Sequence, residues 1–156
     1  MSARTRHAQG FTLVEILIVV VILGILAAIV IPQFTRASES AQASSLASQL
    51  QTVRSQIELY QVQHGGQYPD LSSNWGDMTS ETDDGYGPYF QQAPRNPLAP
   101  SGVDRDSIGS GDDVAWVWDG DANTIKANVR PGVETELERA GMEEGQDFEV
   151  VGGGTT

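Results

Sequence analysis

The residue whose chemistry stands out first in this sequence is a carboxylate inside an apolar run. Glu15 is the only charged residue among the 21 residues from Phe11 to Ile31, and 16 of the others are Leu, Ile, Val or Phe. Inserting those side chains into a bilayer gains on the order of 7 kcal/mol, whereas one acidic group costs about 3 kcal/mol. An ionisable group kept in such a segment is a functional-site hypothesis, and it needs a partner. The alternative is that Glu15 lies at the level of the lipid headgroups.

The residues before the apolar run provide a candidate partner for this carboxylate. The first ten residues hold Arg4 and Arg6 and no acid, and positively charged flanks stay on the cytoplasmic side of a membrane. If the chain were cut after Gly10, this leader would be lost and a new amino group would form on Phe11. That ammonium could pair with Glu15 of the same helix or of an axially displaced neighbour, which predicts a role in assembly.

A second group of acids lies in the stretch VDRDSIGSGDD. Four aspartates fall within ten residues there: Asp104, Asp106, Asp112 and Asp113. Calcium takes about six to eight oxygen ligands, and a flexible loop can offer carboxylates and backbone carbonyls together. Because the chain has no cysteine, the globular head expected at residues 65–133 cannot be stabilised by a disulfide. Calcium is therefore a candidate cofactor. The alternative is a solvated acidic loop.

A catalytic constellation is not apparent elsewhere in the sequence. His64 is the only histidine after Gly10, and there is no phosphate-binding loop, zinc-ligand spacing or cysteine nucleophile. The stretch from Asp119 begins like an EF-hand, but Thr124 replaces the glycine of its sixth position and Arg130 the glutamate of its twelfth. The net charge of −12 argues against direct binding of nucleic acid, whose phosphates require basic groups. We therefore expect a protein that is not an enzyme.

Hydrophobic periodicity indicates the elements that must position these residues. Residues 11–31 are long enough for a membrane-spanning helix, and Pro32 is expected to kink it. Residues 32–64 are expected to continue as an amphipathic helix, which should end at Gly65 and Gly66. Its apolar face repeats at spacings of four and three residues: Leu46, Leu50, Val53, Ile57 and Tyr60.

The rest of the chain predicts a small head followed by an acidic tail. Residues 65–133 are expected to form the head, with a β-hairpin at 114–129 in which apolar residues alternate on each strand. A short helix is expected near Tyr89 to Gln92. Residues 134–156 form the tail, with one or two helical turns from Glu134 to Ala140. Residues 67–102 hold five of the seven prolines and are expected to form a proline-rich loop. Five aromatic side chains are expected to anchor this loop to the core: Tyr68, Trp75, Tyr86, Tyr89 and Phe90.

The stretch GFTLVEILIVVVILGILAAIVIPQF resembles the N-terminal signature of type IV pilins and type II secretion pseudopilins. The resemblance implies a pilin fold of the α+β class, in which a long N-terminal helix packs on a small antiparallel sheet. It also implies that a prepilin peptidase in the membrane removes residues 1–10 by cutting after Gly10, and that it N-methylates Phe11. In that family the glutamate that matches Glu15 neutralises the N-terminal charge of a neighbouring subunit during filament assembly.

For function, the resemblance implies a structural subunit that polymerises from the inner membrane, with its head outside the cytoplasm. The filament would be a type II secretion pseudopilus, which supports protein secretion, or a related pilus. The implied partners are identical or related subunits, the prepilin peptidase, an inner-membrane assembly platform and the membrane itself, and no nucleic acid. The family also implies a calcium site in the head, and a helix that is continuous in the isolated subunit but melts between Gly24 and Pro32 in the filament. Two alternatives are a minor or tip subunit whose head binds a surface or secreted partner, and an anchored enzyme, for which no site is visible.

Overall fold

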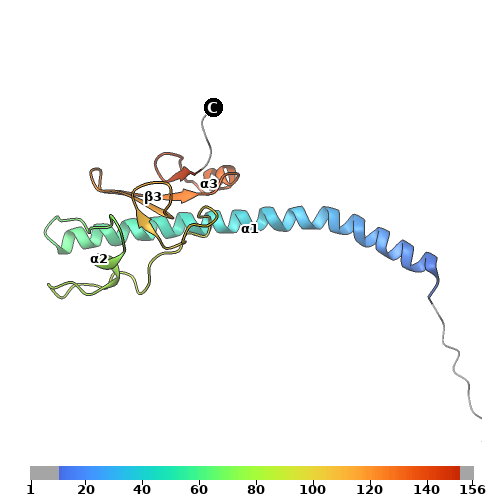
Figure 1. Ribbon diagram of the computed structural model, residues 1–156, viewed down its shortest axis with the longest axis horizontal. Helices are drawn as coiled ribbons and strands as arrows, with labels where there is room; N and C mark the ends of the chain where they lie inside the picture. The colour runs from blue at the N-terminus through green and yellow to red at the C-terminus, as the bar shows by residue number, and fades with distance from the viewer. Residues whose placement is uncertain (1–10, 152–156) are drawn as a thin grey trace, which may run out of the picture. The chain divides into compact units, whose positions relative to one another are not determined.

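The structure is a computed structural model that describes residues 11–151 (Figure 1). The chain divides into two compact units, Met1–Ala37 and Ser38–Thr156. The helix α1 (Leu13–Gln63) runs through both units. The predicted leader, with Gly10, lies outside the described residues, and so do the last five residues of the predicted tail.

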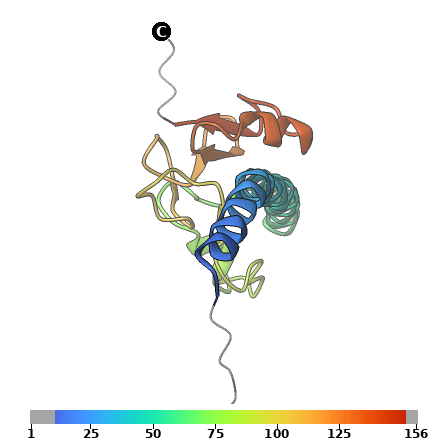
Figure 2. The ribbon, with the colours of Figure 1, turned by 90° about the vertical axis from the view of Figure 1, so that its right-hand side faces the viewer.

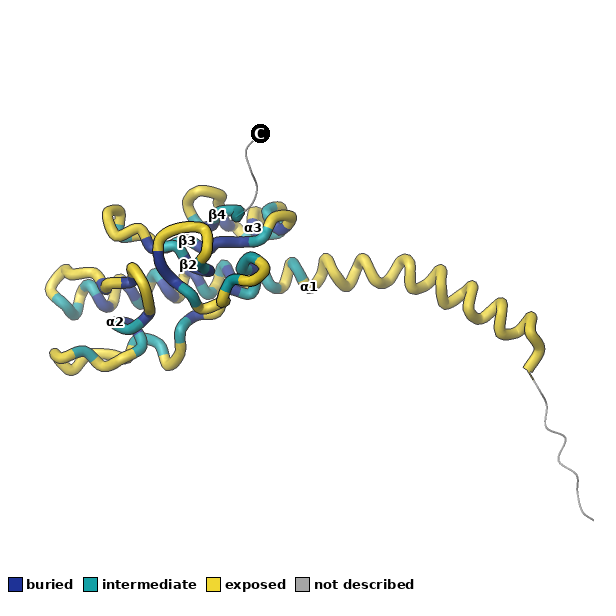
Figure 3. The backbone as a smooth tube through the Cα atoms, viewed as in Figure 1, coloured by how far each residue is buried: buried dark blue, intermediate teal, exposed yellow. Residues whose placement is uncertain are grey.

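The first part of α1 is the apolar segment that the sequence predicts. The residues from Phe11 to Ile31 are all exposed (yellow in Figure 3), and α1 is long and apolar enough to cross a membrane. The helix continues without interruption through Gly24 and Pro32, although Pro32 has no N–H to donate to the Ala28 carbonyl. This confirms a continuous helix in the isolated chain, and melting of the stretch within a filament stays a prediction.

The second part of α1 packs on the head through the predicted face. Six of its side chains are buried: Ala43, Leu46, Leu50, Val53, Ile57 and Tyr60. The sequence predicts burial of the last five, and this is confirmed. The helix ends where glycine permits a left-handed turn, because Gly65 and Gly66 have φ values of 65° and 96°. The Gly66 N–H donates to the Gln61 carbonyl at 2.8 Å and closes the cap.

A four-stranded sheet with the order β1-β2-β3-β4 faces this helix. Its strands are β1 (Ile108–Gly109), β2 (Trp116–Asp119), β3 (Thr124–Val129) and β4 (Phe148–Val150). Strands β2 and β3 pair antiparallel and confirm the predicted hairpin. Strands β1 and β4 pair parallel to their neighbours, so the sheet is mixed rather than antiparallel as predicted. The link from β3 to β4 includes α3 (Glu134–Arg139), and a crossover of this kind returns the chain in the same direction.

The core of the head lies between the sheet and α1. Seen along the helix, the strands and α3 lie on one side of α1, and α2 (Gly76–Thr79) with its loops lies on the other (Figure 2). Five of the six apolar residues predicted to alternate on the hairpin are buried: Trp116, Trp118, Ile125, Ala127 and Val129. The sixth, Val114, lies before β2 and is half-buried. Phe148 of β4 and Leu137 of α3 are also fully buried. The predicted acidic tail therefore contributes a strand and a helix to the core.

The proline-rich loop differs in part from its prediction. The residues from Tyr89 to Gln92 are not helical, because the N–H groups of Tyr89 and Phe90 both donate to the Met78 carbonyl at the end of α2. Trp75 is buried, and Tyr89 and Phe90 pack against the core as predicted. The other two predicted anchors, Tyr68 and Tyr86, are 38% and 41% exposed, so that part of the prediction is wrong.

Two buried asparagines join the loops of the head to the sheet. The Asn96 side-chain amide donates to the carbonyls of Ala115 and Asn128 at 3.0 and 2.7 Å, and its oxygen accepts the Leu98 N–H at 2.9 Å. The Asn128 amide donates to the Gly111 and Val114 carbonyls, both at 2.9 Å. Both residues are fully buried. These bonds hold the chain near residues 96–98 and 111–115 against β3 without a disulfide.

Candidate functional site

The predicted assembly residue Glu15 lies in the first turn of α1, where its carboxylate is held by Thr12. Glu15 Oε2 accepts hydrogen bonds from the Thr12 N–H at 2.9 Å and from the Thr12 hydroxyl at 2.8 Å. In return, Thr12 Oγ1 accepts the Glu15 N–H at 3.2 Å. These reciprocal bonds form a capping box, which satisfies N–H groups that the start of a helix leaves without partners.

The capping box presents a fixed carboxylate at the start of the apolar helix. Phe11 and Leu13 beside it are each 82% exposed. A helix N-terminus carries partial positive charge, which favours the ionised carboxylate near it. The arrangement can accept an ammonium from another chain without first ordering the side chain. Sequence reasoning found Glu15 but gave Thr12 no role, although the spacing T-x-x-E from Thr12 to Glu15 is the sequence signal of a capping box.

The four aspartates of the predicted calcium loop are all exposed. Among residues 11–151 no three Asp, Glu or His side chains lie close enough together to hold a metal ion. Several nearby carbonyls already accept protein hydrogen bonds: Ser107 donates to the Asp104 carbonyl, and Trp75 Nε1 donates to the Asp106 carbonyl at 2.8 Å. The donor set as it stands in the described structure therefore does not fit calcium.

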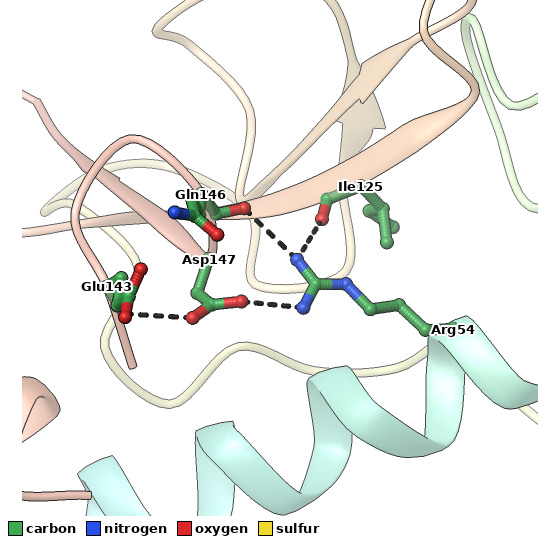
Figure 4. Close-up of polar contacts among 5 residues, drawn as sticks. All are labelled: Arg54, Ile125, Glu143, Gln146 and Asp147. Carbon is green, nitrogen blue, oxygen red and sulfur yellow. Dashed lines mark hydrogen bonds and ion pairs between the residues drawn. The ribbon is translucent and has the colours of Figure 1, made fainter. Parts of the chain in front are cut away.

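An arginine on the polar side of α1 binds the C-terminal part of the head (Figure 4). Arg54 Nη1 lies 2.6 Å from Asp147 Oδ1, and Nη2 donates to the Ile125 and Gln146 carbonyls at 3.0 and 3.1 Å. Asp147 Oδ2 accepts the Glu143 N–H at 2.8 Å. One guanidinium thus joins α1 to β3 and to the turn before β4. Sequence reasoning gave Arg54 no role, because its partners lie 71 to 93 residues away.

His64 lies in an aromatic cluster at the end of α1 and has a packing role. Its ring stacks on Tyr60 with centroids 3.8 Å apart, Nδ1 lies 2.9 Å from the Tyr60 carbonyl and Nε2 lies 3.3 Å from Thr82 Oγ1. Burial raises the pKa of the Tyr60 phenol, and the nearby charge of Asp77 adds to this effect. Burial also raises the pKa of Tyr89, whose hydroxyl donates to Gln63 at 2.6 Å. Both phenols therefore stay protonated at neutral pH, and the Tyr89 phenol acts as a hydrogen-bond donor.

Comparisons with known proteins identify a family model and several relatives that match this chain. Residues 5–31 match the family described as the prokaryotic N-terminal methylation motif. The chain is 32% identical over 91 residues to type II secretion system core protein G of Dickeya chrysanthemi, covering 58% of this chain and 55% of that protein. It is 37% identical over 75 residues to competence protein ComGC of Bacillus subtilis, covering 48% of this chain and 72% of that protein. No solved structure matches the chain.

An apolar N-terminal helix that carries a methylation motif, followed by a small mixed-sheet head, defines the class of pilin-like, membrane-anchored subunits. The chain belongs to the type IV pilin-like family that includes type II secretion core protein G and ComGC. It spans about half the length of the core protein G relatives from Dickeya chrysanthemi and Pectobacterium carotovorum.

Proposed function

We propose that this chain is a structural subunit that polymerises into a type II secretion pseudopilus or a related type IV pilus and supports protein secretion. The observation that carries the proposal is the Glu15 carboxylate, held by Thr12 at the start of an exposed apolar helix. A filament subunit would use this carboxylate to pair with the N-terminus of its neighbour. A chain found in only a few copies per filament would instead be a minor or tip subunit.

The proposal includes the location and the partners of the chain. Before assembly α1 anchors the chain in the inner membrane, and the head lies outside the cytoplasm because Arg4 and Arg6 stay inside. The prepilin peptidase removes residues 1–10, and an assembly platform in the inner membrane adds the mature subunit to the filament. The match of residues 5–31 to the methylation motif supports this processing.

Processing provides the first test of the proposal. Gly10→Val should block removal of the leader, because a branched side chain replaces the small residue at the cut, and the wild-type chain should begin at N-methylated Phe11. Mass spectrometry of the N-terminus of the membrane-extracted protein measures both. Gly24→Val is the matched control, since a Cβ at Gly24 meets nothing within 4 Å, and this variant should be processed normally. A wild-type chain that retains residues 1–10 would contradict the proposal.

Calcium binding by the loop from Asp104 to Asp113 is a further proposal, and it rests on the density of aspartates in a head without cysteine. Because these side chains stand apart in the described structure, calcium would have to draw the loop together. We expect calcium, and not sodium at equal ionic strength, to raise the thermal midpoint of the detergent-solubilised chain. The gain is about 2.7 kcal/mol at a hundred times the dissociation constant. Asp112→Ala with Asp113→Ala should abolish the rise, and a wild-type midpoint that is the same with chelator as with calcium would rule the ion out.

A further inference from the structure

The head carries a groove that includes an exposed arginine. Thr52 and Val53 of α1 line one side, and Phe90, Pro94 and Arg95 line the other, around a volume of about 430 Å³. Much of this wall is apolar. Arg95 is exposed and takes part in none of the ion pairs among residues 11–151. We call this surface the arginine groove. Its apolar wall could bind an aromatic ring, and its free cation could pair with a carboxylate beside that ring.

A loop elsewhere on the same head presents that combination. Residues 81–86 contain Glu81, Asp83, Asp84 and the exposed ring of Tyr86. The loop is preformed, because the Thr82 N–H donates to the Tyr86 carbonyl and the Gly85 N–H donates to the Thr82 carbonyl, both at 2.8 Å. None of the ion pairs in the described part of the chain involves its carboxylates. We call it the tyrosine loop.

The two surfaces lie at different levels along α1. Thr82 of the tyrosine loop contacts His64, and the Tyr86 ring meets the edge of the same imidazole with centroids 5.5 Å apart. The arginine groove lies beside Thr52 and Val53, about eleven residues earlier in the helix, which corresponds to roughly 16 Å along its axis. Since Tyr86 is held against His64, the loop does not fill the groove of its own chain. A second copy displaced along the helix axis could supply it.

We propose that the tyrosine loop of one copy docks in the arginine groove of a neighbouring copy, with Tyr86 on the apolar wall and Asp83 or Asp84 paired with Arg95. This contact rests on the proposed filament function and adds to it a specific link between heads. Because two different surfaces meet, the contact is heterologous and repeats from copy to copy instead of closing in a dimer.

Charge favours a second copy as the occupant. From Gly65 onward the sequence has 18 acidic and 5 basic residues, so copies of the head repel each other unless cations face acids across the interface. Three of the five cations, Lys126, Arg130 and Arg139, are within 4 Å of acids of their own chain. Arg95 and Arg105 are the basic residues of the head outside those pairs, and of the two only Arg95 lines the groove.

Charge reversal with rescue tests the contact in cells that assemble the wild-type filament. Arg95→Glu should lower the filament yield by at least about tenfold, because like charges that face each other across an interface cost several kcal/mol. The amount of processed subunit in the membrane should not change, since Arg95 is exposed. Asp83→Lys with Asp84→Lys should cause a similar loss, and combining these changes with Arg95→Glu should restore filaments. Tyr86→Ala should also lower the yield, without any change of charge.

Arg105→Glu is the matched control, because it makes the same charge change at an exposed residue of the head outside the groove and outside the ion pairs of the described residues. It should assemble nearly as well as wild type. Filaments from Arg95→Glu at wild-type yield, an equal loss in Arg105→Glu, or a failure of the combined variant to recover would each overturn the docking contact. If the wild-type chain itself formed no filaments, the proposed function would fail instead, so the two failures can be told apart.

Discussion

Replacing Glu15 with Leu will leave the chain anchored in the membrane and will prevent its assembly into filaments. The substitution removes an insertion cost of about 3 kcal/mol, so the variant should accumulate in the membrane at least as well as wild type. In a filament, however, the amino group of Phe11 from the next subunit would be left without its carboxylate in an apolar surrounding. A penalty of about 3 kcal/mol corresponds to a factor of roughly one hundred in each subunit contact. Sheared filaments and membrane-bound subunits, quantified separately, measure the two effects.

Glu15→Gln is the control that separates charge from local structure. Glutamine can still accept the two hydrogen bonds that Thr12 donates, so the start of α1 should keep its capping box. If the charge is what assembly requires, this variant should fail as Glu15→Leu does. Wild-type filament yields from either variant would show that the carboxylate only marks the headgroup boundary, and the proposed role of Glu15 would be wrong.

The largest stability effect is expected at the buried asparagine that joins three parts of the head. Asn96→Ala removes its bonds to Ala115, Asn128 and Leu98. The Leu98 N–H and the Asn128 carbonyl are then left without these partners, and each unsatisfied buried group costs about 1–3 kcal/mol. We therefore expect the free energy of unfolding to fall by about 3 kcal/mol. Urea denaturation, followed by tryptophan fluorescence, measures the change.

Asn74→Ala makes the same substitution at an exposed asparagine of the same head. Its side chain bonds to Ser73 and to the Gly76 N–H, but water can replace these bonds, so the loss should stay below about 1 kcal/mol. An Asn96→Ala head as stable as the Asn74→Ala head would mean that the 96–98 and 111–115 segments are held by packing alone.

Sequence patterns correctly predicted those parts of the fold that depend only on neighbouring residues. The spacing of Leu46, Leu50 and Val53 marked the buried face of α1, and Gly65 marked its end, because periodicity and left-handed caps depend only on neighbouring residues. The hairpin β2–β3 followed from alternation around a short turn. Strand β4 was missed, since Phe148–Val150 is a short stretch in an acidic tail and pairs with β3 only after a crossover.

The residues of the candidate site also divide into those with a local sequence signal and those that depend on long-range contacts. Glu15 could be found because a charge in an apolar run is visible in the sequence without any fold. Thr12 carries the capping-box signal T-x-x-E, but its bonds to Glu15 form only when the first turn of α1 is in place. Arg54 had no sequence signal, because nothing local identifies an acceptor such as Asp147, which is 93 residues away. The arginine groove likewise exists only once α1 and residues 90–95 have come together.

The bond between Arg54 and Asp147 has a consequence for when the head can fold. Arg54 sits in the first half of the chain, while Asp147 and the parallel strand β4 come near its end. Contacts between residues so far apart in sequence form slowly, because a long loop must close before they can stabilise anything. The head therefore cannot complete its fold until Asp147 and β4 have left the ribosome. Truncation before Asp147 would also turn β3 into an exposed edge, open to pairing with other chains.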